Sequence, residues 1–228
     1  MTMQQASRKY SDFADALARR ALDKLIASTQ SPSEYQAAML ELGHQLGGIL
    51  RRQIPRGHQC LVVSTAEDAD YLSTGVIESL EADHDTLAAV FWNNHYSING
   101  SNIAPIVHHF IQPGFESAKA IIFVKSIIST SCVVRTNILS LLESVKADDI
   151  YIVAPVIYID AEQALKAEFP ASISERFRFV YFAVDEERTT TGNVVPGIGG
   201  QVYQLLGMAD QPARTGYLPN LVKKRACL

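Results

Sequence analysis

Short apolar runs alternate with amphipathic stretches along most of the chain. The runs are rich in Val, Ile, Leu and Phe, and runs of this length are typical of buried strands. The stretches between them carry apolar residues at helical spacing. Strands that alternate with helices predict an α/β fold with a parallel sheet covered on both faces. The expected strands are Cys60–Val63, Leu87–Trp92, Ala120–Val124, Ile150–Val156 and Phe179–Val184.

Helical spacing also predicts two helices before the first strand. The first covers Gln4–Ser28, and the second begins at Pro32, with Ser31 as its cap, and ends near Arg52. We expect residues 1–57 to form a helical segment that covers the core or a subunit interface, and residues 58–228 to form the main domain. Three further helices are expected, at Asp68–Glu81, Cys132–Lys146 and Asp160–Phe169.

An Asn-Gly pair at residues 99–100 predicts the tight turn of a β-hairpin, whose returning arm is Ile103–Ile111. Three histidines lie on this hairpin. Adjacent residues of a strand point to opposite faces, so His108 and His109 are not expected to share a metal. His95 is a candidate base or lid contact, and the alternative is an exposed hairpin residue.

Composition narrows the class of protein. The chain has 228 residues, 47% of them hydrophobic, and a net charge of −4, which argues against nucleic acid or an anionic membrane as the partner. No apolar run approaches the roughly 20 residues of a membrane span. The three cysteines have no metal-ligand spacing, so we expect no metal site, and we expect a reducing, cytoplasmic location.

The segment Asp185–Gly207 carries the most specific signal. It reads DEERTTTGNVVPGIGGQVYQLLG. In register and without a gap, it closely resembles the C-terminal segment of the uracil phosphoribosyltransferase family, and the resemblance extends over about Leu61–Gly207. It implies a type I phosphoribosyltransferase fold with a parallel sheet, a hairpin arm and a C-terminal hood (residues 185–207) whose backbone binds a pyrimidine. It also implies a homodimer.

The residues that handle phosphoribosyl pyrophosphate in the family are replaced here. By this resemblance, Lys125 stands where relatives have an acidic residue that faces the ribose, and Glu67 stands where they have an arginine. Such a polyanionic substrate requires positive side chains, helix N-terminal amides and carboxylates for magnesium. Further replacements are Ser131 and Cys132 for two glycines of the phosphate loop, Asn93 for the hairpin arginine, and Gly200 for a hood aspartate.

These replacements define a candidate rebuilt site. Lys125, Cys132 and Glu67 are the candidate catalytic residues. Cys132 begins a predicted helix whose amides would lower its thiol pKa, or it is a buried packing residue. Lys125 could form an imine or bind an anion, or it could pair with Glu67. The candidate ligand-binding residues are Thr130, Ser131, Val194, Gly199, Gly200, Gln201 and Tyr203, the last of which stacks on a ring or packs on the sheet.

Three functions remain open at this point. The first is an enzyme that acts on a uracil-like or other small polar ligand under the hood. The second is a sensor or pseudoenzyme that binds a base or nucleotide without chemistry. The third is an active uracil phosphoribosyltransferase that makes UMP, and it is the one reading that requires a cofactor, magnesium. None of the three involves nucleic acid or a membrane.

Overall fold

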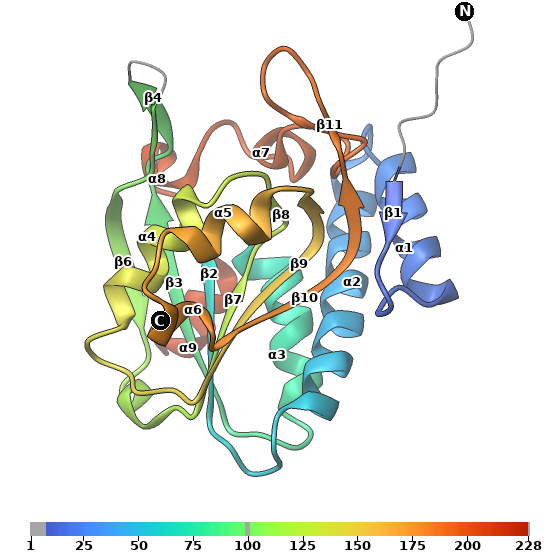
Figure 1. Cartoon of the computed structure of the whole chain (residues 1–228). Helices are drawn as coiled ribbons and strands as arrows, with labels where there is room; N and C mark the ends of the chain where they lie inside the picture. The colour runs from blue at the N-terminus through green and yellow to red at the C-terminus, as the bar shows by residue number, and fades with distance from the viewer. Residues whose placement is uncertain (1–7, 99–100, 228) are drawn as a thin grey trace, which may run out of the picture.

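The computed structural model describes residues 8–98 and 101–227 of the chain. In this described part, one eight-stranded sheet runs through the molecule with helices on both faces (Figure 1). In spatial order the strands are β1 (Arg8–Tyr10), β10 (Phe177–Asp185), β9 (Asp149–Tyr158), β7 (Ala120–Val124), β2 (Cys60–Thr65), β3 (Thr86–Asn93) and β6 (Ile106–Ile111), and β8 (Ile127–Ile128) extends the pairing with β9.

The five central strands, from β10 to β3, are parallel, and the two edge strands β1 and β6 are antiparallel to their neighbours. The predicted α/β class, a mostly parallel sheet flanked by helices, is therefore confirmed. After the edge strand β1, the chain builds the parallel part of the sheet from β2 outward to β3, then returns to β7 and moves outward in the other direction to β9 and β10. The order therefore reverses between β2 and β7.

Helices cover the two faces of the sheet unequally. α1 (Ala16–Ala27), α2 (Pro32–Gln53) and α3 (Thr74–Leu80) pack on one face, and α4 (Cys132–Leu141) and α5 (Ala161–Ala167) pack on the other. Buried side chains of β2 alternate between the two layers, as the pleat requires. α2 and α3 approach closely at Gly75, where a Cβ atom would lie 2.4 Å from the carbonyl oxygen of Leu40.

Two predicted helices differ from the structure. Arg8–Tyr10 is a strand rather than the start of a helix, and α1 begins only after Asp15, whose side chain accepts hydrogen bonds from Leu17 and Ala18 at its N-terminus. The first four residues of the predicted helix, 4–7, lie outside the described residues. The predicted helix Asp68–Glu81 begins as a π-helical turn, Ala69–Ser73, and continues as α3.

The predicted hairpin arm is present. β4 (Tyr96–Ile98) pairs antiparallel with β5 (Ser101–Ile103), and the Asn-Gly pair between them lies outside the described residues. β6 then returns along β3 and completes the arm. Figure 1 places the hairpin at the same end of the sheet as the hood.

The hood is a compact turn rather than an open loop. β11 (Glu187–Arg188) pairs with β12 (Val194–Val195), and a glycine-rich turn leads into α7 (Val202–Leu205). At Gly197 φ is +55° and a Cβ atom would lie 2.3 Å from the carbonyl oxygen of Val194, so only glycine fits there. The short helix α6 (Ala171–Ser174) precedes β10 and the hood. Two further short helices, α8 (Pro212–Thr215) and α9 (Asn220–Arg225), follow the hood.

A buried ion pair ties the hood to the first strand. Both oxygens of Asp185 accept hydrogen bonds from Arg8, at 2.9 and 2.7 Å, and the amide of Gly197 donates to the same carboxylate at 2.8 Å. Arg8 also donates to the carbonyl oxygen of Gly197 at 2.6 Å. From α2, the buried hydroxyl of Tyr35 donates to the carbonyl oxygen of Ile198 at 2.9 Å. These contacts fix the hood against the body of the protein.

Among the helices of the described residues, none has both the length and the apolar character that crossing a membrane requires.

The Arg8 pair gives a first test. Replacing Arg8 with Met leaves the Asp185 carboxylate buried without its cation, so we expect the free energy of unfolding to fall by about 3–5 kcal/mol. Lys9→Met is the matched control, because Lys9 is 68% exposed and its pair with Glu186 contributes about 1 kcal/mol or less. Urea denaturation of the two variants measures both effects. Equal, small losses would show that the Arg8 pair does not hold the hood.

Candidate functional site

The candidate site lies where the strand order reverses, outside the carboxyl ends of β2 and β7. In open α/β sheets, ligands bind in the crevice at such a switch point. Glu67 and Asp68 follow β2, and Lys125 follows β7 directly. Since the two strands are parallel neighbours, their ends bring these three side chains together.

Lys125, Glu67 and Asp68 form a buried ionic cluster. The ammonium of Lys125 donates to Asp68 Oδ2 at 2.6 Å and to Glu67 Oε1 at 3.1 Å. The hydroxyl of Thr65 also donates to Asp68 Oδ2, at 2.9 Å. Glu67 and Asp68 are only 6% and 2% exposed. The predicted ion pair of Lys125 with Glu67 is thus present. Asp68, the first residue of a predicted helix, is the nearer partner of Lys125.

The cluster keeps Lys125 charged. Burial alone would lower the pKa of Lys125, but the Asp68 and Glu67 carboxylates outweigh it and raise the pKa above its ordinary value. An imine requires the neutral amine, so this arrangement opposes that role. The same contacts occupy both carboxylates of the cluster. Across residues 8–98 and 101–227, no group of His, Cys, Asp and Glu is arranged to hold a metal.

A pocket of about 320 Å³ opens beside the cluster, between the loop after β7 and the hood. It contains seven of the ten predicted site residues. These are Glu67, Lys125, Thr130, Val194, Gly200, Gln201 and Tyr203. Ile127, Ser129, Asn193 and Ile198 complete much of its wall.

The other three predicted site residues do not line this pocket. Ser131 lies beside Thr130, but its hydroxyl donates to Glu168 at 2.8 Å on α5's side. Gly199 packs against α1's end, where a Cβ atom would lie 2.4 Å from Thr29 Cγ2. Cys132 begins α4, half-buried, and there burial and Glu168 raise its thiol pKa, although Arg135 opposes them. The shift is thus upward, opposite to the lowering expected from the helix N-terminus, and its largest cause is desolvation of the thiolate.

Arg188 and His95 also line the pocket, and the sequence did not indicate Arg188 at all. The guanidinium of Arg188 lies 3.7 Å above the ring of Tyr158 and donates to the carbonyl oxygen of Ser129. It therefore joins the hood to the loop before α4. A basic residue directly after the three acidic residues 185–187 was the one available signal.

Two titratable rings face the ionic cluster. Burial lowers the pKa of His95, and Lys125 lowers it further against the opposing effect of Glu67. Burial and the nearby Glu67 raise the pKa of Tyr203. At neutral pH the site therefore presents a neutral imidazole and a neutral phenol beside a charged lysine. Such groups can donate and accept hydrogen bonds with a polar ligand.

A second, larger hollow of about 830 Å³ lies over the outer edge of β10. Its walls include Asp12, Asp149, Glu162 and Arg178, and none of the predicted site residues.

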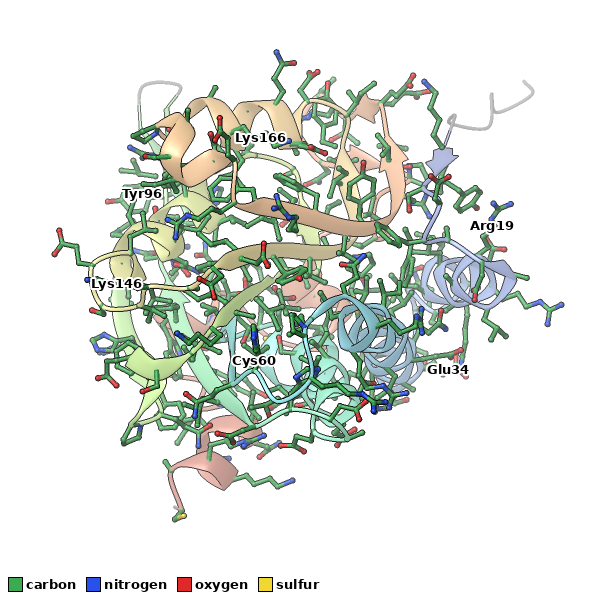
Figure 2. The ribbon with its side chains drawn as sticks, turned by 60° about the horizontal axis from the view of Figure 1, so that its bottom comes forward. Arg19, Glu34, Cys60, Tyr96, Lys146 and Lys166 are labelled. Atoms are coloured by element: carbon green, nitrogen blue, oxygen red, sulfur yellow. The ribbon has the colours of Figure 1, made fainter. Side chains whose placement is uncertain are left out.

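Cys60 begins β2 and lies at the opposite end of that strand from the ionic cluster. Figure 2 shows Cys60 far from Tyr96, which lies at the root of the hairpin. Its burial and the nearby Asp85 raise its thiol pKa to about 12.

Comparison with known proteins supports the fold. No protein-family model matches the chain, and no curated protein matches it. Among solved structures, the AQ2163 protein from Aquifex aeolicus superposes with a TM-score of 0.69 at 11% identity, over 86% of this chain and 97% of the other. This likeness shows a shared α/β fold.

Weaker overlaps include two transferases. A hypoxanthine phosphoribosyltransferase from Staphylococcus aureus has a TM-score of 0.45 at 14% identity, over 66% of this chain and 74% of the other. An adenine phosphoribosyltransferase from Thermoanaerobacter pseudethanolicus has a TM-score of 0.41 at 8% identity, over 63% and 83%.

The ionic cluster gives a second test. Lys125→Met leaves two carboxylates buried side by side, so we expect a loss of about 3–5 kcal/mol in the free energy of unfolding. Adding Asp68→Asn removes one of the charges and should restore part of this loss, which a double-mutant cycle measures. Lys166→Met is the control, since its pair with Glu162 is exposed. If the single and double variants lose the same stability, the three charges do not act together.

Proposed function

We propose that this protein binds a small, polar, planar molecule of the pyrimidine base or nucleoside class in the pocket under the hood, and that it does not transfer phosphoribosyl groups. The observation that carries the proposal is the Lys125–Asp68–Glu67 cluster. It places two carboxylates against one ammonium at the switch point, which leaves a net negative charge there, while the hood beside it remains intact.

The charge of the site argues against a polyanionic substrate. Lys125 and Arg188 are the cations of the pocket, and Lys125 is already paired with two carboxylates. Phosphoribosyl pyrophosphate would have to approach Glu67 and Asp68, whose negative charges repel its own. A buried contact between like charges costs several kcal/mol. Transfer to uracil is therefore the least favoured of the three functions.

The size and lining of the pocket suit a small heterocycle. Its volume of about 320 Å³ is at the lower end of the range for small-molecule sites. One wall is the hood, where Gly200 and its neighbours present backbone amides and carbonyls. The amide side chains of Gln201 and Asn193, joined by a hydrogen bond of 2.6 Å, lie on the same wall. Tyr203 supplies an aromatic ring that can stack or donate.

The state of the two candidate nucleophiles favours binding over covalent chemistry. Lys125 is held protonated, and the thiol pKa of Cys132 is raised. A sensor or pseudoenzyme is accordingly the main proposal. An enzyme that uses general base catalysis is the second candidate, because His95 lines the pocket and its lowered pKa keeps it neutral at physiological pH.

The resemblance of residues 185–207 to uracil phosphoribosyltransferases supports a pyrimidine as the ligand. The hood segment matches that family in register, and residues of the hood line the same pocket as the loop after β7. We therefore propose descent from a phosphoribosyltransferase that kept the base subsite and lost the diphosphate and metal subsites.

Ligand binding can be tested by thermal shift with uracil, uridine, UMP, UTP and phosphoribosyl pyrophosphate with magnesium. We expect uracil or uridine to raise the melting temperature, since ligand at about 100 Kd adds about 2.7 kcal/mol of stability. Phosphoribosyl pyrophosphate should have no effect, and no UMP should form when it is mixed with uracil and magnesium. A shift with phosphoribosyl pyrophosphate alone, or UMP formation, would contradict the proposal.

Two adjacent residues provide a matched pair of variants. Thr130 lines the pocket, whereas the hydroxyl of its neighbour Ser131 bonds Glu168 outside it. Thr130→Trp should fill the pocket and weaken binding of the stabilising base at least about tenfold, while Ser131→Trp should leave the affinity within about twofold. Isothermal titration calorimetry measures both. Equal affinities in the two variants would place the ligand elsewhere.

A further inference from the structure

The segment that follows the hood reaches back to the root of the hairpin. Gln211, 8% exposed, forms two hydrogen bonds with the backbone of His95: the His95 amide donates to Gln211 Oε1 at 2.8 Å, and Gln211 Nε2 donates to the His95 carbonyl oxygen at 2.8 Å. A single side chain thus binds both backbone groups of His95, as a neighbouring strand would.

Gln211 is itself firmly placed. Its backbone carbonyl accepts from the amide of Arg214 at 2.9 Å at the start of α8. Further along the segment, the indole of Trp92 donates to the carbonyl oxygen of Tyr217 at 2.8 Å, and Asp70 accepts from the Tyr217 hydroxyl and from the Leu221 amide. The segment is therefore anchored to β3 and to the π-helical turn before α3, and it can hold His95 in a fixed position.

His95, at the root of the hairpin, lines the pocket. The charged groups that act on the ring are Lys125, which follows β7, and Glu67, which follows β2. Tyr203 on α7 and Arg188 of the hood line the same pocket. A ring in this position meets a ligand held under the hood. The pKa of His95 is lowered, so its neutral form, with one donor and one acceptor nitrogen, is the form present near neutral pH.

We propose that His95 is a ligand-contacting, specificity-determining residue and that Gln211 is the positioning residue that holds it over the pocket. This inference rests on the proposed function, because it uses the same pocket. It assigns a role to the residues beyond Gly207, which lie outside the segment that resembles the uracil phosphoribosyltransferases. In this proposal, the hood backbone forms hydrogen bonds with the ligand from one side, and the imidazole of His95 forms hydrogen bonds with it from the other.

The proposal sets the pH dependence of binding. As pH falls through the lowered pKa of His95, below its usual 6.5, the imidazole gains a proton and loses its acceptor nitrogen. The new charge lies near the ammonium of Lys125. Affinity for a neutral base should therefore be constant above pH 6.5 and should fall below the His95 pKa. The lowered pKa also means that the stability contributed by the neutral ring is lost as pH falls from 6.5 to the His95 pKa, with no further loss below it.

The test compares Gln211→Met with Gln204→Met. Methionine keeps the length of the glutamine side chain and removes both hydrogen bonds, and Gln204 is an exposed residue of α7 outside the pocket lining. The first measurement is the NMR titration of the His95 ring in the ligand-free protein. We expect the His95 pKa to move toward 6.5 in Gln211→Met and to stay unchanged in Gln204→Met.

The second measurement is the affinity for uracil between pH 5 and pH 8. We expect at least tenfold weaker binding in Gln211→Met and a pH profile that moves with the His95 pKa. An unchanged titration and an unchanged profile in the folded variant would overturn the inference. If Gln211→Met does not fold, Gln211→Glu, which keeps the acceptor for the His95 amide and loses the donor, serves in its place under the same two criteria.

The two measurements separate this inference from the proposed function. If no base binds the unmodified protein, the proposed function fails and the role of His95 in recognition fails with it, while the ring titration still decides whether Gln211 positions His95. If a base binds and His95→Ala leaves its affinity and pH profile unchanged, the proposed function stands and the inference is wrong.

Discussion

The enclosure of one ammonium between two carboxylates, at the ends of two neighbouring parallel strands, constrains the rest of the site. Lys125, Asp68 and Glu67 are buried where an α/β sheet places its ligand crevice. Removing Lys125 leaves two carboxylates uncompensated away from water, which is far more costly than removing the group as a whole. The cluster therefore fixes the electrostatics that a ligand meets: its net charge is negative, and the guanidinium of Arg188 in the same pocket offsets it.

The hood depends on a second buried pair, contributed by a distant part of the chain. Asp185 ends the strand β10, and its carboxylate is shared between Arg8 and the amide of Gly197. The first strand of the protein thus holds the backbone that forms the wall of the pocket. Gln211 does the same for the opposite wall through His95. Both walls are therefore held in position by residues, Arg8 and Gln211, that do not line the pocket themselves.

The sequence predicted the parts of this structure that repeat or that match a long motif. The five parallel strands follow from apolar runs, the hairpin from an Asn-Gly pair, and the hood from its glycine and proline register. The sequence did not indicate β1, because three residues carry no periodicity and Arg8 pairs with a residue far along the chain. Arg188 and Gln211 were missed for the same reason, since each acts through a contact that only the folded chain creates.

The same coupling bears on the proposal that the site no longer binds phosphoribosyl pyrophosphate. Restoring an acidic residue at position 125 alone would place three carboxylates together in a buried space, at a cost of several kcal/mol, instead of rebuilding a metal site. Glu67 and Asp68 would have to change with it, because the change removes the lysine that is paired with both. The three residues are therefore stable as one set of charges or as its replacement, and intermediates between the two are penalised. This constraint supports the proposal of an uncharged ligand, since the net negative charge of the set opposes an anionic one.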